Sequence, residues 1–111
     1  MIVRVWRGWA SADDAPSYEK LLNETIAPEI MKRGIVGVRE LAVLRRSDSE
    51  ADGSSEFLTL MAFDDWRAVA DFAGPDPPVS VVPPPARALL TRFDARSQHY
   101  ELLARHLPDP K

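Results

Sequence analysis

Along the first ten residues the side chains fall into two interleaved sets, as they do in a β-strand that packs on both faces. Branched and aromatic side chains, the types that strands favour, are frequent in both sets. The two interleaved sets are Ile2, Arg4, Trp6 and Gly8 on one side, and Val3, Val5, Arg7 and Trp9 on the other. The pattern predicts a strand over residues 2 to 10 with side chains packed on both faces.

The spacing changes after residue 10, and apolar residues then recur every three or four positions. This stripe, which predicts one amphipathic helix, comprises Tyr18, Leu21, Leu22, Thr25, Ile26 and Ile30. Ser11 or Asp13 is expected at its N-cap. Pro28 donates no hydrogen bond and is expected to kink the helix, which should end at Gly34.

The rest of the chain shows two further strands, a second helical region and a last strand. Residues 35 to 46 form an extended pattern, residues 47 to 55 are polar turn formers, and residues 56 to 63 are almost wholly apolar. Asp64 or Asp65 should cap a short helix that ends near Ala73. Six prolines over residues 75 to 85 predict a stiff connector, followed by a short helix over residues 86 to 93. A strand is expected over residues 96 to 103, and a frayed tail from His106.

The predicted order is β-α-β-β-α-β with one extra short helix. It indicates an α+β, ferredoxin-like fold in which a single domain, residues 1–111, has a four-stranded antiparallel sheet with its helices on one face. The other face should then expose apolar side chains, and a second copy related by a two-fold axis is the simplest cover. The residues expected there are Trp6, Val36, Val38, Leu44, Leu58, Leu60 and Tyr100.

Composition narrows the classes of partner and of chemistry. The chain has 111 residues, a net charge of −3 and no cysteine, so disulfides, thiolate nucleophiles and sulfur-ligated metal sites are excluded. The negative charge disfavours nucleic-acid and anionic-membrane partners. The N-terminus lacks the unbroken apolar run of a signal peptide, and no stretch is long enough for a membrane span, so a cytoplasmic protein is expected.

The candidate chemistry centres on His99, because no phosphate-binding glycine loop and no nucleophile elbow is present. Glu101 lies two residues further along the same strand face and can fix the histidine tautomer. If the last strand lies antiparallel beside the first, Arg7 and Trp9 can share a sheet face with His99. A structural histidine held by Glu101 is the plainer interpretation. A metal site that starts from His99 and Glu101 is a further one, although the sequence offers no third ligand.

Several segments together resemble the antibiotic biosynthesis monooxygenase-like family of the dimeric α/β-barrel superfamily. They are the strand 3–9, the helix with Tyr18 and Pro28, the turn 34–37, the run 57–64, the run 72–74, and 99–101. The resemblance implies a homodimer whose sheets close into a barrel, with a ligand cleft between sheet and helices in each subunit. It covers nearly the whole chain.

The family has two functional branches, and this sequence fits one of them better than the other. The haem-degrading branch uses an Asn-Trp-His set, where this chain has Arg7, Phe63 and no histidine on the second helix. The other branch oxygenates phenolic polycycles without metal or flavin. The resemblance thus implies a monooxygenase without cofactor that acts on a small aromatic or quinol-type compound.

In that interpretation each candidate residue has a role. Arg7 would polarise the substrate oxygen, His99 would carry the proton and Glu101 would orient His99. The residues expected to bind the aromatic ligand are Trp9, Trp66 and Tyr100. The alternative, because a fold does not fix a function, is a dimer without catalysis that binds a small molecule or assists a neighbouring enzyme.

Overall fold

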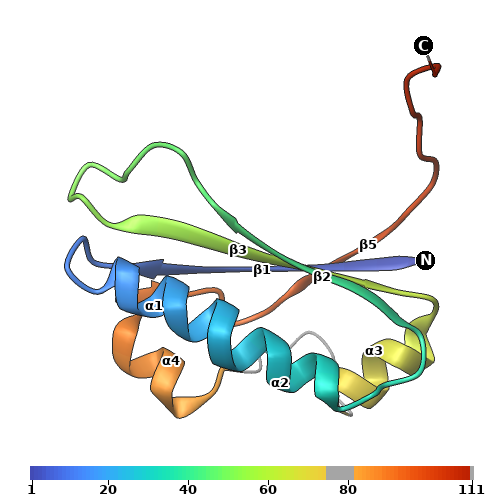
Figure 1. The fold of residues 1–111 in the computed structure, drawn as a ribbon, viewed down its shortest axis with the longest axis horizontal. Helices are drawn as coiled ribbons and strands as arrows, with labels where there is room; N and C mark the ends of the chain where they lie inside the picture. Colours follow the sequence, from blue (N-terminus) through green and yellow to red (C-terminus); the bar gives the residue numbers. More distant parts are fainter. Residues whose placement is uncertain (75–81, 111) are drawn as a thin grey trace.

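The computed structural model describes residues 1–74 and 82–110 and shows an antiparallel sheet with its helices on one face (Figure 1). Its strands are β1 (Ile2–Ala10), β2 (Val38–Arg45), β3 (Ser55–Phe63), β4 (Arg92–Phe93) and β5 (Gln98–Glu101). In the sheet, β3 lies between β2 and β1. β4 and β5 both pair with the other edge of β1. The predicted ferredoxin-like α+β fold is confirmed, but in the described residues the sheet has five strands and not the four expected, because β4 and β5 both pair with the edge of β1 opposite β3. Within the described residues, no helix is long and apolar enough to cross a membrane.

The first helical segment is continuous from residue 15 to residue 32 and changes its hydrogen-bonding pattern twice. It consists of α1 (Ala15–Leu21), a π-helix η1 (Leu22–Ile26) and α2 (Ala27–Lys32). The irregularity expected at Pro28 takes the form of this π-helical stretch, which ends just before Pro28 in the first turn of α2. The expected N-cap is corrected: Asp14 is the cap residue, without a side-chain cap, and Ser11 Oγ accepts a bond from the Asp14 N–H.

The later elements differ from the predictions in length. α3 (Trp66–Ala73) begins as expected, since the Asp65 side chain accepts a bond from the Ala68 N–H. The helix expected over 86–93 is instead α4 (Pro84–Leu89), because Thr91 donates its N–H to the Trp9 carbonyl and β4 joins the sheet. β5 is shorter than the strand predicted over residues 96–103. It ends at Glu101, and the next N–H, that of Leu102, donates to the carbonyl of Met1, which lies just before β1. Residues 75–81 of the expected proline connector lie outside the described residues.

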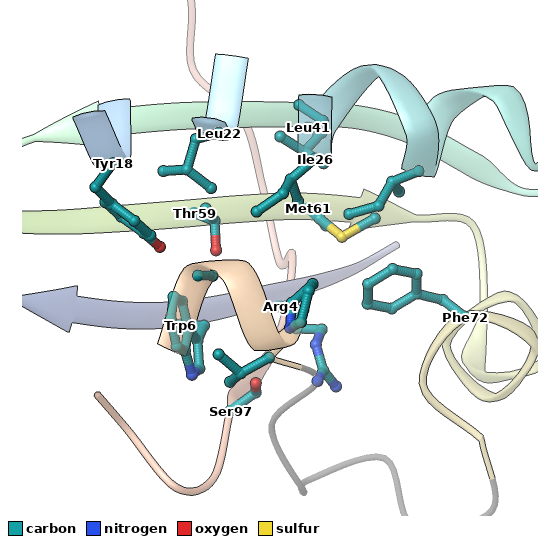
Figure 2. Close-up of a pocket in the computed structure, with 15 residues that line it drawn as sticks. Arg4, Trp6, Tyr18, Leu22, Ile26, Leu41, Thr59, Met61, Phe72 and Ser97 are labelled. Carbon is teal, nitrogen blue, oxygen red and sulfur yellow. The ribbon is translucent and has the colours of Figure 1, made fainter. Parts of the chain in front are cut away.

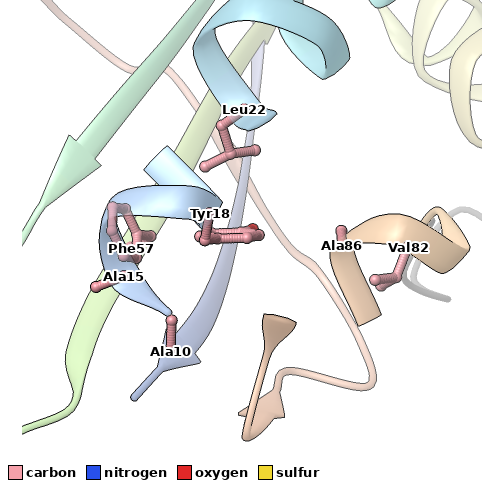
Figure 3. Close-up of a cluster of buried hydrophobic side chains, with 7 residues drawn as sticks. All are labelled: Ala10, Ala15, Tyr18, Leu22, Phe57, Val82 and Ala86. Carbon is pink, nitrogen blue, oxygen red and sulfur yellow. The ribbon is translucent and has the colours of Figure 1, made fainter. Parts of the chain in front are cut away.

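The helices bury the sheet face that carries the even-numbered residues of β1. Two clusters form there: one around Phe57 and Tyr18, which meet edge to face at 5.0 Å, and one around Phe63, which is fully buried. Figure 3 shows the first cluster, in which side chains of the sheet, α1 and α4 meet. Burial of these apolar groups is the main stabilisation of the two layers.

The opposite sheet face is not covered by any described helix (Figure 1). The register places Leu44, Leu58, Leu60 and Tyr100 on it, as expected, and Leu44 and Tyr100 are 47% and 57% exposed. Trp6 and Val38, which were expected on this face, lie on the helix face instead. Val36 is in the turn before β2 and is also not part of this face.

Two glycines of the turn between α2 and β2 have positive φ angles, but their surroundings differ. Gly34 has φ +62° and open space where a Cβ would stand, whereas Gly37 has φ +92° and a Cβ there would lie 2.9 Å from that of Ala68. The Gly37 carbonyl also accepts the N–H of Asp64, so the turn is fixed against the start of α3.

We therefore expect Gly37→Ala to destabilise the protein more than Gly34→Ala. The backbone conformation alone costs alanine about 1–2 kcal/mol, and overpacking against Ala68 adds about 1–3 kcal/mol at residue 37. Urea denaturation of both variants measures the difference in the free energy of unfolding. Equal losses would contradict the tight packing of this turn on α3.

Candidate functional site

A cavity of about 70 Å³ lies between the sheet and the helices. Its wall is mostly apolar and is built by side chains of β1, β2 and β3 and of the helical segments (Figure 2). The apolar wall includes Leu22, Ile26, Ile30, Leu41, Met61 and Phe72, and the polar side chains at its surface are Arg4, Trp6, Tyr18, Thr59 and Ser97. An apolar enclosure with a few convergent polar groups is the usual form of a small-ligand site.

The π-helix supplies part of this wall. Leu22 and Ile26 are its first and last residues, and both line the cavity. A π-helical turn widens the helix and is often found at functional sites, because it redirects side chains that a regular helix would aim elsewhere. Pro28 lies in the first turn of α2, directly after this stretch, so the place where the sequence predicted a kink holds a π-helical stretch that lines the cavity.

Arg4 is the charged residue among the described residues that line the cavity, and it is 4% exposed. It lies directly opposite His99 in the β1–β5 register, and its Nη1 is 3.0 Å from His99 Nε2. A guanidinium only donates, so Nε2 accepts and the proton of the neutral imidazole is on Nδ1. Burial lowers the pKa of His99, and the positive charge of Arg4 lowers it further.

Aromatic rings surround this pair. The guanidinium of Arg4 lies 5.5 Å from the ring centre of Phe72, and the ring of Trp66 lies 5.3 Å from that of His99. Both aromatic residues belong to α3, so this helix fixes the pair from outside the sheet. Trp66 is 51% exposed and does not line the cavity, whereas Phe72 does. His99 itself lies behind Arg4 and is not part of the cavity wall.

Among the described residues, three hydroxyl groups also lie at the cavity surface. Ser97 is 4% exposed, and its Oγ is buried without a hydrogen-bond partner among the described residues. Burial raises the pKa of Tyr18 to about 12, so its phenol remains a proton donor at neutral pH. Thr59, on β3, carries the third hydroxyl. Buried hydroxyls of this kind commonly bond to a ligand or to ordered water.

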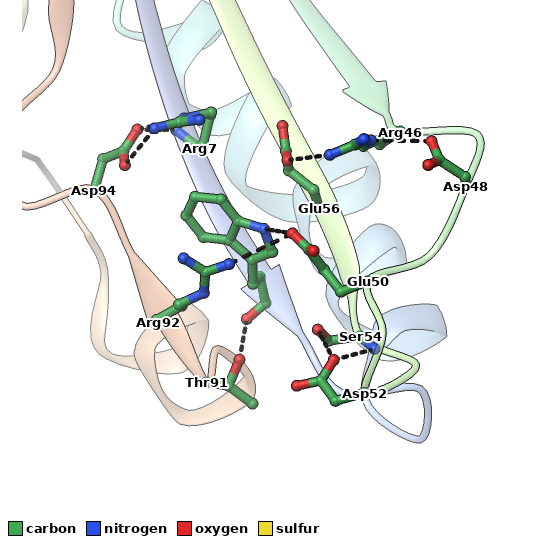
Figure 4. A network of polar contacts seen from close by, with 11 residues as sticks. Arg7, Arg46, Asp48, Glu50, Asp52, Ser54, Glu56, Thr91, Arg92 and Asp94 are labelled. Carbon is green, nitrogen blue, oxygen red and sulfur yellow. Dashed lines mark hydrogen bonds and ion pairs between the residues drawn. The ribbon is translucent and has the colours of Figure 1, made fainter.

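The structure does not bring Arg7 and Trp9 to His99, which corrects the shared face expected from the sequence. The register pairs His99 with Arg4, and odd-numbered residues of β1 point to the opposite face. There Arg7 forms a two-pronged ion pair with Asp94, and the Trp9 Nε1–H donates to Glu50 at 2.9 Å. Figure 4 shows Arg7, Asp94 and Glu50 in this surface network.

Glu101 and Tyr100 also lie apart from the cavity. Glu101 shares a face with His99 but is exposed, and in the described part of the chain no hydrogen bond joins the two. Tyr100 pairs with Val3 on the uncovered sheet face. Within residues 1–74 and 82–110, no three histidine, aspartate or glutamate side chains gather as metal ligands would.

The residues that the sequence analysis missed carried a recognisable signal. Arg4 is the only charged member of the alternating set that also contains Ile2 and Trp6, and a lone charge on an apolar strand face indicates a buried polar function. Ser97 is two residues before His99 and therefore shares its side of the chain. Tyr18 was placed on the buried stripe of the helix, and its hydroxyl could have been expected to seek a partner.

Neither a protein-family model nor a curated protein matches the sequence, but solved structures match the fold. A putative antibiotic biosynthesis monooxygenase from Deinococcus radiodurans has a TM-score of 0.62 and 16% identity over 99% of this chain and 100% of its own. One from Bacillus cereus has a TM-score of 0.62 and 12% identity over 96% and 97%. The chain has the fold of these proteins.

An ethyl tert-butyl ether D (EthD) family protein from Bacillus halodurans shares the same fold more distantly. Its TM-score is 0.54 and its identity is 20%, over 93% of this chain and 100% of that chain. The resemblance expected from the sequence is thus confirmed for the fold, along nearly the whole length. At these identities the likeness carries the architecture only, and the chemistry has to be argued from the cavity.

We expect His99 to take up its proton only below its ordinary pKa of 6.5. The pKa of His99 is lower in the folded protein than in the unfolded chain. The neutral imidazole therefore contributes its full stability above pH 6.5, and this stability is lost as the pH falls through the lowered pKa. Replacing Arg4 by methionine removes the nearby charge and should raise the pKa of His99. NMR titration of the imidazole signals measures the pKa of His99 in the wild type and in Arg4→Met. A wild-type pKa at or above 6.5 would contradict the burial of His99 beside Arg4.

Proposed function

We propose that this protein is a monooxygenase without cofactor that acts, as a homodimer, on a small quinol-type aromatic compound. The observation that carries the proposal is the buried Arg4 guanidinium at the surface of a mostly apolar cavity. The names of two structures of the same fold support a monooxygenase. Such a cavity favours an aromatic molecule whose oxygen carries negative charge, because a cation in a low-dielectric site stabilises that anion.

The Arg4 cation would stabilise the ionised form of the substrate, and the reaction starts from that form. Hydroquinone that binds as its anion is a better electron donor to dioxygen than the neutral quinol. One oxygen atom forms a new C–O bond on the ring, and the O–O bond then breaks. The other oxygen leaves as water with the hydrogen of that ring carbon and one phenolic hydrogen, so the departing oxygen, and not a protein base, takes the carbon-bound hydrogen. The products are 2-hydroxy-1,4-benzoquinone and one water, so that the substrate loses four electrons and dioxygen gains them.

The roles assigned from the sequence are redistributed in this proposal. Arg4 takes the part expected of Arg7, since it lines the cavity and Arg7 does not. His99 is a positioning residue: its Nε2 accepts from Arg4 and holds the guanidinium against the cavity. Trp66 shields His99 rather than touching the ligand. The substrate-binding part expected of Trp9 passes to the rings of Trp6 and Phe72.

A ligand-binding dimer without catalysis is the second candidate, and one observation favours it. Among the described residues that line the cavity, the titratable ones are Arg4 and Tyr18, and neither accepts a proton near neutral pH. A reaction that needs the protein to remove a proton from carbon is therefore unsupported. A molecule that arrives already ionised would simply bind.

Oxygen consumption distinguishes the two candidates. We expect hydroquinone in air to consume oxygen faster with the protein than in buffer. Arg4→Met should lower the enzyme-dependent rate by about 100-fold, as loss of one charge-stabilising donor does elsewhere. Arg7→Met, on the same strand but the opposite face, should keep the rate within twofold. Oxygen uptake equal to buffer would favour the binding protein, and loss of activity in Arg7→Met alone would restore the sequence-based assignment.

A charged residue introduced on the uncovered sheet face tests the proposed homodimer. Leu44 and Met31 are each 47% exposed, but Leu44 is on β2 at the uncovered face and Met31 is on the outer helical layer. We expect wild-type protein to sediment as a dimer, Leu44→Glu to sediment as a folded 12.4 kDa monomer, and Met31→Glu to remain dimeric. A monomeric wild-type protein at micromolar concentration would refute sheet-to-sheet pairing.

A further inference from the structure

One hydroxyl at the cavity surface lacks a hydrogen-bond partner among the described residues. We infer that Ser97 is a ligand-binding residue, whose side chain forms a hydrogen bond with a ring hydroxyl of the molecule in the cavity. The inference deepens the proposed function, on which it rests for the choice of the cavity and of an aromatic ligand. It requires neither a charged ligand nor a ligand of a particular size.

The hydroxyl of Ser97 is buried but unsatisfied. Ser97 is 4% exposed and lines the cavity (Figure 2), and its Oγ makes no hydrogen bond to any described residue. Burying a hydroxyl without a partner is unfavourable, so native structures rarely keep one unless a ligand or an ordered water completes it. Alanine fills two other places in the same wall, at Ala27 and Ala86, and would avoid this penalty at residue 97. The hydroxyl therefore indicates a hydrogen bond that the protein itself does not supply.

The nitrogen donors of the wall already have partners within the protein. The Trp6 Nε1–H donates to the Asp94 carbonyl at 2.8 Å, and Arg4 Nη1 lies 3.0 Å from His99 Nε2. Ser97 differs from both, because neither its proton nor its lone pairs are used by a described residue. A serine hydroxyl can donate and accept at the same time, so the group that satisfies it best can do the same. The phenolic hydroxyl of a quinol is such a group.

The backbone is fixed on both sides of Ser97, which keeps its side chain at the cavity. On one side the Asp94 N–H donates to the Arg7 carbonyl, and on the other Gln98 pairs with Val5 of β1. Ser97 does not lie in a helix, so its hydroxyl cannot donate to a carbonyl one turn earlier, as helical serines do. A hydroxyl that the sheet holds in place in this way is preorganised for a ligand.

Phenol and toluene isolate the contribution of the ligand hydroxyl, because they differ only by a hydroxyl in place of a methyl group of similar size. An apolar cavity without a polar partner disfavours phenol, since the phenol hydroxyl loses its hydrogen bonds to water. We expect wild-type protein to bind both compounds saturably, and Ser97→Ala to lower the ratio of phenol affinity to toluene affinity by about tenfold. NMR chemical-shift titration measures both dissociation constants. An unchanged ratio in Ser97→Ala, or no phenol binding to the wild type, would overturn the inference.

A matched serine variant and a stability measurement complete the test. Ser54 is 6% exposed, but its hydroxyl donates to Asp52 and it does not line the cavity, so Ser54→Ala should keep the wild-type ratio. An equal fall of the ratio in Ser54→Ala would overturn the role of Ser97. Without ligand, Ser97→Ala should unfold at the same urea concentration as the wild type or at a higher one, because it removes an unsatisfied group. A lower midpoint, or failure to fold, would mean that the hydroxyl already has a partner such as an ordered water, and would also overturn the inference.

The outcomes separate this inference from the proposed function. Titration with phenol and toluene under nitrogen measures binding alone, because no oxygen is present to react. The expected fall of the ratio without oxygen uptake from hydroquinone in air would support Ser97 as a ligand-binding residue and refute the monooxygenase. Oxygen uptake together with an unchanged ratio would support the monooxygenase and refute the role of Ser97.

Discussion

The strand β1 constrains every other part of the molecule, because it is hydrogen-bonded on both edges and carries side chains to both faces. β3 fixes its register along all nine residues, and β4 and β5 fix its other edge. A slip by one residue would exchange the two faces. As a result Arg4 and Arg7, three residues apart, have opposite environments: Arg4 is buried beside the cavity, and the Arg7 side chain is 47% exposed beside Asp94. One strand thus separates the face with the cavity from the uncovered face.

Asp94 connects these two faces at the break between β4 and β5. Its backbone carbonyl accepts the Trp6 Nε1–H at 2.8 Å, and its carboxylate accepts the Arg7 guanidinium. The first bond fixes the indole at the cavity wall, and the second holds the same segment to the surface of the sheet. An exposed ion pair supplies little stability by itself. Its effect here is positional, because the segment that it holds also leads into Ser97 and His99.

The sequence allowed the fold to be predicted but not the partners within the site. Alternation over β1 correctly grouped Arg4 with Ile2 and Trp6, and the proline in the first helix correctly indicated an irregularity. The pairing of His99 with Arg4 rather than Arg7 depends on the register of β5, which is set by the length of the segment after α4. That segment was expected to be helical to residue 93, whereas β4 ends the helix early. A difference of a few residues there decides which arginine meets the histidine.

The absence of a base among the described cavity residues limits which chemistry the site can support. Tyr18, with a pKa of about 12, holds its proton, and a guanidinium does not release one near neutral pH. His99, although neutral, is separated from the cavity by Arg4 and uses its Nε2 to accept from it. In the reaction we propose for this cavity, the substrate supplies its own anion, which the cation then stabilises. A quinol meets that requirement through its own acidity, and a carbon acid that depends on a protein base does not. In that proposed reaction binding and catalysis would share one determinant, because Arg4 would both hold the anion and make it reactive toward oxygen.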